Sequence, residues 1–256
     1  MEKFLLGKTI LVVGAGGLLG VDLVTSLLKQ SAKVIASDIN SDSLKTQLVD
    51  AGVQFEKENI VLQSLDITNE ESIKDLFQNV GSIDGAVNTS YPRNKEYGKH
   101  FFDVTLDSFN ENVSLQLGTS FLFMQQCAEY FVKHKKPFSL VNISSIYGVI
   151  APKFEIYKDT SMTTPVEYVA VKSALINLSK YVVKYVCDSR FRVNVVSPGG
   201  VLDMQPEIFI KAYKSNSLGK GMLEAKDVTK PILFLLSSQS EYLNGQNIIV
   251  DDGFSI

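Results

Sequence analysis

Residues 12–20 read Val-Val-Gly-Ala-Gly-Gly-Leu-Leu-Gly, and they join an apolar, β-branched run, Thr9–Val13, to a helical pattern that runs to about Gln30. Glycine permits a tight turn and a close approach to a ligand, and the amides at a helix N-terminus bind negative charge. Strand, glycine-rich turn and helix in this order are typical of a dinucleotide-binding unit. Asp38 lies 18 residues after Gly20, at the end of a second apolar strand. A carboxylate there can accept hydrogen bonds from the adenosine ribose and would repel a 2′-phosphate, so we expect NAD rather than NADP.

Short apolar runs continue to alternate with longer helical patterns towards the C-terminus, which predicts a parallel sheet with helices on both faces. The predicted strands are Thr9–Val13, Lys33–Ser37, Asn59–Leu65, Asp84–Asn88, Phe138–Ile143, Arg192–Ser197 and Gln246–Val250. We therefore expect an α/β protein with a single Rossmann-type, doubly wound sheet of about seven parallel strands, in one dinucleotide-binding and catalytic domain over residues 1–256. The irregular segments 91–101, 146–167 and 202–222 each follow the carboxyl end of a strand, where open α/β sheets bind ligands. We expect these three loops to bind the substrate.

Composition argues against several other classes of protein. The chain has 256 residues, 45% of them hydrophobic, and its 25 basic and 28 acidic residues form no long block of like charge. This argues against a nucleic-acid partner or a membrane-binding surface. Neither a signal-peptide pattern nor a long apolar span is present, so we expect a cytoplasmic protein. Cys127 and Cys187 lie in apolar helical patterns and are expected to be buried side chains in a reducing compartment, with no metal site.

Tyr168 and Lys172 are four residues apart, which places a phenol and an ammonium one turn apart on the same helix face. A nearby cation favours the phenolate, so we expect the pKa of Tyr168 to fall below its ordinary value of about 10, which would make it a usable acid or base. Upstream, Ser144 and Ser145 close an apolar strand, and a hydroxyl there could bind a substrate oxygen. Both patterns also occur without function, because tyrosine and lysine suit solvated helix faces and serine is common in turns.

In their order along the chain, these motifs resemble those of the short branch of the short-chain dehydrogenase/reductase family. The matching set is Gly14–Gly20, Asp38, Leu65-Asp66-Ile67-Thr68, Val87-Asn88, Ile143-Ser144-Ser145, Tyr168 with Lys172, Asn194–Gly199 and Gly245–Gly253. The resemblance implies an NAD-dependent enzyme that interconverts a secondary alcohol and a ketone by hydride transfer. It implies that Tyr168 is the acid/base, that Lys172 lowers its pKa and holds the nicotinamide ribose, and that Ser145 positions the reacting oxygen. It also implies a homodimer or homotetramer.

The same resemblance implies which residues bind the cofactor. Asp66 would touch the adenine, and Asn88 would support the cofactor pocket. Pro198, Gly199 and Val201 would line the nicotinamide. The complete expected set is Gly14, Gly17, Leu18, Leu19, Gly20, Asp38, Ile39, Asp66, Ile67, Asn88, Tyr168, Lys172, Pro198, Gly199 and Val201.

Some positions depart from the family pattern. The spacing within Gly14–Gly20 resembles the extended, sugar-nucleotide branch, although the chain ends soon after Gly253, as the short branch does. The family's fourth catalytic residue, an asparagine on the helix before Gly118, is absent from its place. Ser114 and Leu115 occupy that neighbourhood, with Asn112 offset; the fourth-strand motif is Asn88-Thr89-Ser90-Tyr91 rather than Asn-Asn-Ala-Gly, and Asp203 stands where a threonine is common.

The loop between Ser145 and Tyr168 is roughly ten residues longer than is common in the family, and a long irregular loop in a compact domain is usually functional. Its Pro152–Tyr157 stretch is similar to bacterial oxidoreductases linked to flagellin modification and nonulosonic-acid sugar biosynthesis. Residues 91–100 carry a cluster of basic side chains, among them Arg93, that could bind a phosphate, although a solvated loop gives the same pattern. We expect a small-molecule substrate, with an anionic sugar such as a sugar phosphate or nucleotide sugar as the favoured class. Two alternatives remain: an NAD-retaining sugar isomerase, epimerase or dehydratase, and a catalytically weak nucleotide-binding scaffold.

Overall fold

A computed structural model describes residues 3–57 and 59–256 of the protein. Its strands form one seven-stranded parallel sheet in the order β3-β2-β1-β4-β5-β6-β7. The strands are β1 (Thr9–Val13), β2 (Lys33–Asp38), β3 (Ile60–Ser64), β4 (Gly85–Asn88), β5 (Phe138–Ile143), β6 (Phe191–Pro198) and β7 (Asn247–Val250). Every predicted strand is present with its ends within one residue of the expected positions, which confirms the predicted fold class.

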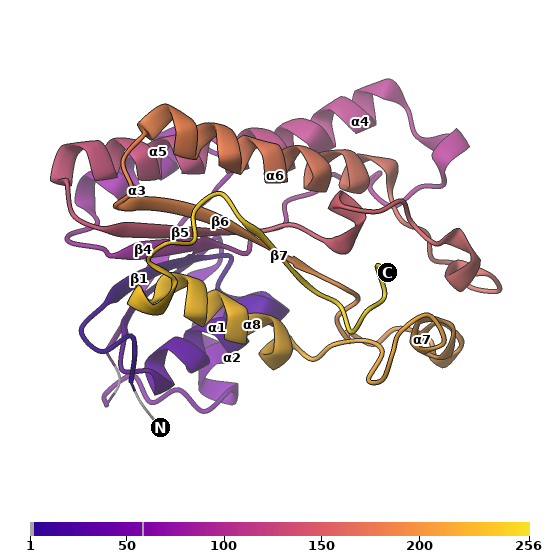
Figure 1. Cartoon of the computed structure of the whole chain (residues 1–256), viewed down its shortest axis with the longest axis horizontal. Coiled ribbons are helices and arrows are strands. Elements are labelled where there is room, and N and C mark those ends of the chain that lie inside the picture. The colour runs from indigo at the N-terminus through magenta and orange to yellow at the C-terminus, as the bar shows by residue number, and fades with distance from the viewer. Residues whose placement is uncertain (1–2, 58) are drawn as a thin grey trace.

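The helices cover both faces of the sheet (Figure 1). One face carries α1 (Leu18–Lys29), α2 (Ser41–Asp50) and α8 (Ala225–Leu236). The opposite face carries α3 (Glu70–Asn79), α4 (Leu106–Val113), α5 (Thr119–His134) and α6 (Val166–Val186), and α7 (Glu207–Lys214) lies beyond the carboxyl ends of the strands. Each face has its own apolar core, so the central strands are buried on both sides. This explains why β5 and β6 are continuously buried rather than alternating in and out.

The strand order places the predicted functional segments at one edge of the sheet. β1 lies between β2 and β4, so the chain winds away from β1 in both directions and leaves a crevice at the carboxyl ends of the strands. Val13 at the end of β1 pairs with Ser37 on one side and Asn88 on the other, and Asn88 pairs with Asn142 of β5. The carboxyl ends of β1, β4 and β5 therefore lie side by side. The glycine turn, the loop after β4 and the serine pair Ser144-Ser145 begin at these ends.

The two cysteines have different surroundings. Cys127 is buried in α5, as predicted, and burial raises the pKa of its thiol. The prediction for Cys187 is wrong: it is exposed. α6 ends at Val186, and Cys187 caps it in the left-handed backbone conformation (φ 51°), outside the apolar helix face.

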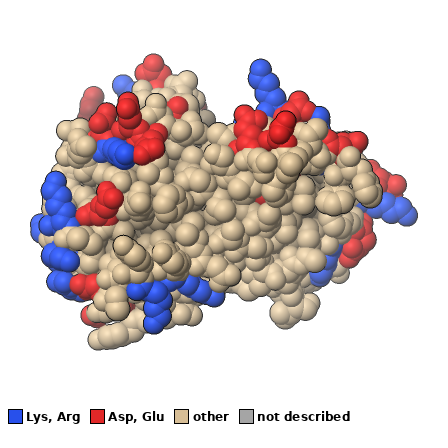
Figure 2. Space-filling model, turned by 90° about the horizontal axis from the view of Figure 1, so that it is seen from above, with Lys and Arg blue, Asp and Glu red and all other residues tan. Residues whose placement is uncertain are grey.

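Figure 2 looks onto the layer of helices that contains α5 and α6. Acidic and basic side chains mix at the margins of this face, and its middle is largely uncharged. No helix within the described residues is long and apolar enough to cross a membrane. In the same described ranges, no group of three or more His, Cys, Asp and Glu side chains is placed to hold a metal ion.

Candidate active site

The glycine turn is formed by close contacts between backbone atoms. Gly14 has a φ of +75°, which favours glycine, and a Cβ there would lie 2.6 Å from the backbone nitrogen of Ser90. A Cβ at Gly20 would lie 2.2 Å from the carbonyl oxygen of Gly14. Side chains at these two positions would therefore displace the turn from β4 or from α1, which is why the sequence has glycine at both.

The N-terminus of α1 has no side-chain cap and no acidic residue in its first turn. By contrast, Asn40 and Asn69 cap α2 and α3, and both of those helices begin with acidic residues. No side chain of α1 itself therefore neutralises the positive end of its dipole. Asp38 is held beside this turn, where one carboxylate oxygen accepts from the Gly16 amide (2.9 Å) and the other from the Ile39 amide (2.8 Å).

The described residues form a cleft of about 590 Å³ and another of about 610 Å³. Volumes of this size are common for ligand-binding sites. The one of about 590 Å³ lies between β3 and α3, away from the predicted chemistry. The one of about 610 Å³ opens at the carboxyl ends of the strands and is the candidate active site. Predicted residues that line it are Gly17, Leu18, Leu19, Ser145, Tyr168, Lys172, Pro198, Gly199 and Val201.

The other predicted cofactor residues do not line this pocket. Gly14 and Gly20 shape the turn beneath it, while Asp38, Ile39, Asp66 and Ile67 lie outside its lining, as does Asn88, which lines a smaller cavity next to it. The Asp66 carboxylate accepts hydrogen bonds from the Thr68 amide (2.9 Å) and the Thr68 hydroxyl (2.7 Å), so part of its capacity stabilises its own loop.

The two serines at the end of β5 have different partners. The Ser144 hydroxyl donates to the main-chain carbonyl of Lys172 (2.7 Å), which ties β5 to α6. The Ser145 hydroxyl faces the pocket, accepts from the Tyr147 amide (3.2 Å) and lies beside the Tyr168 phenol. Of the two, Ser145 is therefore the serine that can reach a bound ligand beside Tyr168.

The Tyr168–Lys172 pair differs from its electrostatic prediction. Burial raises the pKa of Tyr168, and the neighbouring Ser145 hydroxyl opposes that rise. The Lys172 ammonium lies 5.5 Å from the centre of the Tyr168 ring and donates to the Ile143 carbonyl (2.8 Å). Burial lowers the pKa of Lys172 to about 8. In this structure desolvation therefore outweighs any effect of the lysine on the phenol, and the expected fall in the pKa of Tyr168 is not seen.

Comparisons with known proteins agree with this arrangement. A family model described as enoyl-(acyl carrier protein) reductase matches residues 17–255. Post-translational flagellin modification protein A of Campylobacter coli is 36% identical over 254 residues, which cover 97% of this chain and 98% of that protein. A crystal structure of a short-chain dehydrogenase from Leptospira borgpetersenii with bound NAD⁺ is 31% identical, has a TM-score of 0.85 and aligns over 98% of this chain and 94% of that one.

This chain belongs to the short-chain dehydrogenase/reductase family. It is therefore an oxidoreductase by family, and the resemblance to flagellin-modification enzymes is confirmed. Another relative is the 7alpha-hydroxysteroid dehydrogenase of Bacteroides fragilis, 26% identical over 262 residues that cover 97% of this chain and 95% of that enzyme.

One departure from the family pattern places an aromatic ring at the centre of the site. Tyr91, which stands where the family motif ends in glycine, packs edge-on against Tyr168, with ring centres 5.9 Å apart. The Lys172 ammonium and the Arg93 guanidinium each lie 5.5 Å from the centre of its ring. The Tyr91 hydroxyl is hydrogen-bonded to that of Tyr97. The altered motif was visible in the sequence, but its contact with Tyr168 and Lys172 was not.

The offset Asn112 has a structural role. Its side-chain amide is buried and donates to the Asn94 side chain (3.0 Å) and to the Glu167 carboxylate (3.1 Å), while its oxygen accepts from the Asn94 amide (3.0 Å). These bonds tie loop 91–101 to the start of α6. Asn112 is therefore engaged away from the pocket, and it does not replace the family's catalytic asparagine.

Sequence reasoning missed Tyr213, which lines the far wall of the pocket, and the residues that support it from behind. The Gly200 amide donates to the Tyr213 hydroxyl (2.7 Å), and the Tyr213 ring stacks on Phe254 with centres 4.2 Å apart. Lys153 donates to the Phe254 carbonyl (2.8 Å) and lies over its ring. This cluster joins loops 146–167 and 202–222 to the C-terminal segment.

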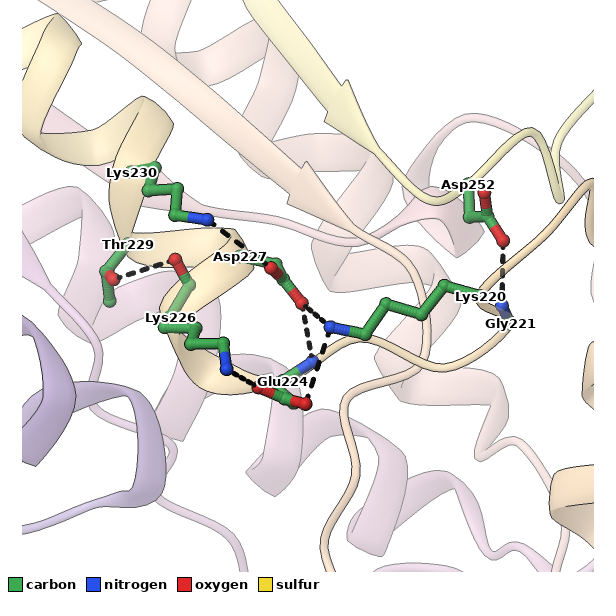
Figure 3. A network of polar contacts seen from close by, with 8 residues as sticks. All are labelled: Lys220, Gly221, Glu224, Lys226, Asp227, Thr229, Lys230 and Asp252. Carbon is green, nitrogen blue, oxygen red and sulfur yellow. Dashed lines mark hydrogen bonds and ion pairs between the residues drawn. The ribbon is translucent and has the colours of Figure 1, made fainter.

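The end of loop 202–222 is anchored by the polar network of Figure 3. The Asp252 carboxylate accepts from the amides of Gly219 (3.0 Å) and Gly221 (2.7 Å). Lys220 pairs with Asp227, which also accepts from the Glu224 amide (3.0 Å) in the box that caps α8. The end of the loop is therefore tied to the segment after β7 and to the start of α8.

Proposed function

We propose that this protein is an NAD(H)-dependent oxidoreductase that interconverts a secondary alcohol and a ketone, with Tyr168 as the acid/base. The observation that carries this proposal is that Ser145, Tyr168 and Lys172 line the same pocket as the uncapped N-terminus of α1. A scaffold that only binds nucleotide would have no use for a hydroxyl, a phenol and an ammonium gathered there.

The residues present fit a nicotinamide dinucleotide. The turn leaves no space for a Cβ at Gly14 or Gly20, and the uncapped N-terminus of α1 suits a pyrophosphate. The Asp38 carboxylate beside the turn suits ribose hydroxyls and disfavours a 2′-phosphate, so NAD is proposed as the cofactor. The NAD⁺-bound Leptospira borgpetersenii relative supports this choice. When bound, the nicotinamide supplies or accepts the hydride.

The chain's own residues would donate or accept the proton and would hold the reacting oxygen of the substrate in place. In the reducing direction, the Tyr168 hydroxyl gives its proton to the substrate oxygen while Ser145 hydrogen-bonds to that oxygen. Because burial raises the pKa of Tyr168, the phenol holds its proton near neutral pH until it is needed. Lys172, buried beside it, supplies the positive charge that favours the phenolate once the proton has left.

The proposed substrate is an anionic sugar bound by loops 91–101, 146–167 and 202–222, all of which contribute to the pocket wall. Arg93 lines the pocket, and within the described residues its guanidinium has no carboxylate partner. A planar cation presented in this way suits a phosphate or a carboxylate. The sequence resemblance to oxidoreductases of flagellin modification and nonulosonic-acid sugar biosynthesis supports this class, and the Campylobacter coli relative is named for flagellin modification.

The test is to measure NADH formation or consumption with a panel of sugar phosphates, nucleotide sugars and simple ketones or alcohols. Tyr168→Phe should lower turnover by about 10²–10⁴-fold, the usual contribution of a general acid or base, without changing NADH affinity. Tyr242→Phe is the control, since it removes the same hydroxyl from a side chain that is 93% exposed and lies outside the pocket. Near-normal turnover in Tyr168→Phe would refute the mechanism, and turnover without net change in NADH would favour the isomerase alternative.

We further propose that the protein forms a homodimer or homotetramer through the face of α5 and α6. Phe121, Tyr181 and Tyr185 are exposed there, and the last two stack with ring centres 6.1 Å apart. Such exposed aromatic groups are enriched at interfaces between proteins. Light scattering should give a mass of two or four times 28.3 kDa, whereas a mass of 28.3 kDa would contradict this proposal.

A further inference from the structure

The long loop of residues 146–167 has a defined shape beside the pocket. Phe154–Tyr157 forms a short 3₁₀ helix within it. The Thr160 hydroxyl donates to the main-chain carbonyl of Tyr157 (2.7 Å), and the Tyr157 ring packs against Phe209 of α7 with centres 5.1 Å apart. These contacts hold the side chain of Tyr157, which lines the pocket. The loop, longer than is common in the family, therefore brings a further phenol to the candidate active site.

The Tyr157 hydroxyl has a proton that no neighbouring group holds firmly. Thr164, which is 8% exposed, donates to the Tyr157 oxygen (2.6 Å). A hydroxyl has one proton to donate, and the acceptor for that of Tyr157 among the described residues is the Tyr147 oxygen, 3.4 Å away. This distance exceeds the roughly 2.5–3.0 Å of ordinary O–H···O hydrogen bonds. The proton of Tyr157 is therefore available to a bound ligand.

Tyr157 also lies near the groups that act on the substrate. Burial has the largest effect on the pKa of Tyr168, followed by the Ser145 hydroxyl, and the neighbouring Tyr157 raises this pKa further. The reacting carbonyl oxygen has two lone pairs, and in the proposed mechanism Tyr168 and Ser145 use both. A third donor beside them has no acceptor left on that oxygen. It can donate to a second oxygen, and an oxygen on the next carbon is the nearest one that a substrate can offer.

We propose that Tyr157 is a specificity-determining residue that donates a hydrogen bond to an oxygen on the carbon next to the reacting carbon. The substrate is then a vicinal hydroxyketone in the reducing direction and a vicinal diol in the oxidising direction, and sugars contain both arrangements. Bound substrate replaces the long contact to Tyr147, while Thr164 keeps the Tyr157 proton directed at the pocket. This inference rests on the proposed function, because it places Tyr168 at the reacting oxygen.

The selectivity comes from the cost of an unpaired hydroxyl. A ketone that lacks the second oxygen displaces water from the pocket and leaves the Tyr157 proton without an ordinary acceptor. A site that is built to hydrogen-bond a substrate hydroxyl rejects the analogue without it for this reason. Removal of the Tyr157 hydroxyl should therefore weaken the preference for the hydroxyketone and leave the reaction of a simple ketone unaffected.

A matched pair of substrates tests this role. 3-Hydroxy-2-butanone and 2-butanone differ in the hydroxyl next to the carbonyl, and each is offered with NADH to the wild type and to Tyr157→Phe. The measure is the change in the ratio of their two kcat/KM values, because the intrinsic reactivity of each ketone is the same with either protein. Tyr157→Phe should lower this ratio by about tenfold to a hundredfold, through the hydroxyketone alone. An equal loss with both ketones would show that Tyr157 only packs, and would overturn the proposal.

Thr164 supplies a second pair of variants. Thr164→Val removes the hydroxyl that orients Tyr157, so it should lower the same ratio, by less than Tyr157→Phe does. Thr164→Ser keeps the hydroxyl and should preserve the ratio. Tyr242→Phe is again the control, because its side chain is 93% exposed, and it should change neither kcat/KM value. A wild-type ratio in both Tyr157→Phe and Thr164→Val would overturn the proposal.

A crystal structure with NADH and 2,3-butanediol tests the contact without turnover. One diol hydroxyl should lie at Tyr168 and Ser145, and the other within about 2.5–3.0 Å of the Tyr157 oxygen. A second hydroxyl directed at any other group, or a pocket without diol, would overturn the proposal. A diol bound by Tyr157 in a protein that transfers no hydride to any compound of the panel would instead contradict the proposed function, so the two failures are distinguishable.

Discussion

Closely packed backbone atoms form the side of the pocket where we propose that the cofactor binds, called the cofactor side, whereas several aromatic side chains help to form the opposite, proposed substrate side. On the first side, Gly14, Gly20 and the start of α1 are in such close contact that a single Cβ would collide with a neighbouring backbone. On the second, Tyr147, Tyr213 and Phe254 belong to a separate apolar cluster outside the two main cores. The cofactor side thus depends on the absence of side chains, and the substrate side depends on their presence.

This difference explains how one fold can keep its cofactor while its substrate changes. The turn Gly14–Gly20, here called the backbone cradle, is so closely packed against its surroundings that it tolerates few substitutions. Its position relative to the sheet and α1 therefore stays fixed. An aromatic cluster between loops can be rebuilt from other apolar residues of similar volume without disturbing the sheet. Substitutions on the two sides should therefore have different effects. Those that truncate the aromatic cluster should weaken substrate binding, and those that add atoms to the backbone cradle should weaken cofactor binding.

The largest effect is expected from Phe254→Ala. Phe254 is fully buried between Tyr213 and Lys153, and truncation of a buried phenylalanine typically lowers the free energy of unfolding by about 3–5 kcal/mol. Denaturant unfolding should show this loss, and substrate KM should rise more than the Kd for NADH. Phe102→Ala, at a side chain that is 95% exposed, should change neither value. An equal loss of NADH and substrate binding would mean that the two sides of the pocket are not independent.

Gly20→Ala tests the cofactor side by the opposite change, the addition of one carbon. Its Cβ would start 2.2 Å from the Gly14 carbonyl oxygen, so α1 must shift away from the turn. Overpacking of this kind typically costs about 1–3 kcal/mol, and NADH affinity measured by fluorescence should fall. Gly81→Ala, where a Cβ meets no atom within 4 Å, should leave affinity and stability near the wild-type values. Normal NADH binding by Gly20→Ala would show that the turn can shift to accept a Cβ without losing its ability to bind the cofactor.

The cofactor side was also the more predictable from sequence, for a physical reason. Its geometry is local: Gly14 to Gly20 and Asp38 lie within two successive strands, and glycine spacing reports a backbone conformation directly. The buried strands were equally predictable. Because β5 and β6 are covered on both faces, their sequences are nearly continuous apolar runs.

The substrate side and the electrostatics depend on contacts between distant segments, which no local pattern reports. Tyr213 meets Gly200 and Phe254 only after the chain has folded. The pKa of Tyr168 was predicted from its spacing to Lys172 alone. Burial reversed its direction, because desolvation is a property of the whole pocket.

The Asp38 carboxylate is held beside the glycine turn, and its substitution should have the smallest of these effects, on the choice between NAD and NADP. Asp38→Asn keeps an acceptor for the Gly16 amide but removes the charge, so NADP should bind more tightly relative to NAD by about tenfold. Asp38→Ala also loses the hydrogen bond to Gly16, so NAD affinity itself should fall. Asp42→Ala, which removes the same charge from the exposed first turn of α2, is the control and should leave the NAD-to-NADP ratio unchanged. If Asp38→Asn kept the wild-type ratio, discrimination would reside in the backbone cradle, and the carboxylate would serve only to fix the turn.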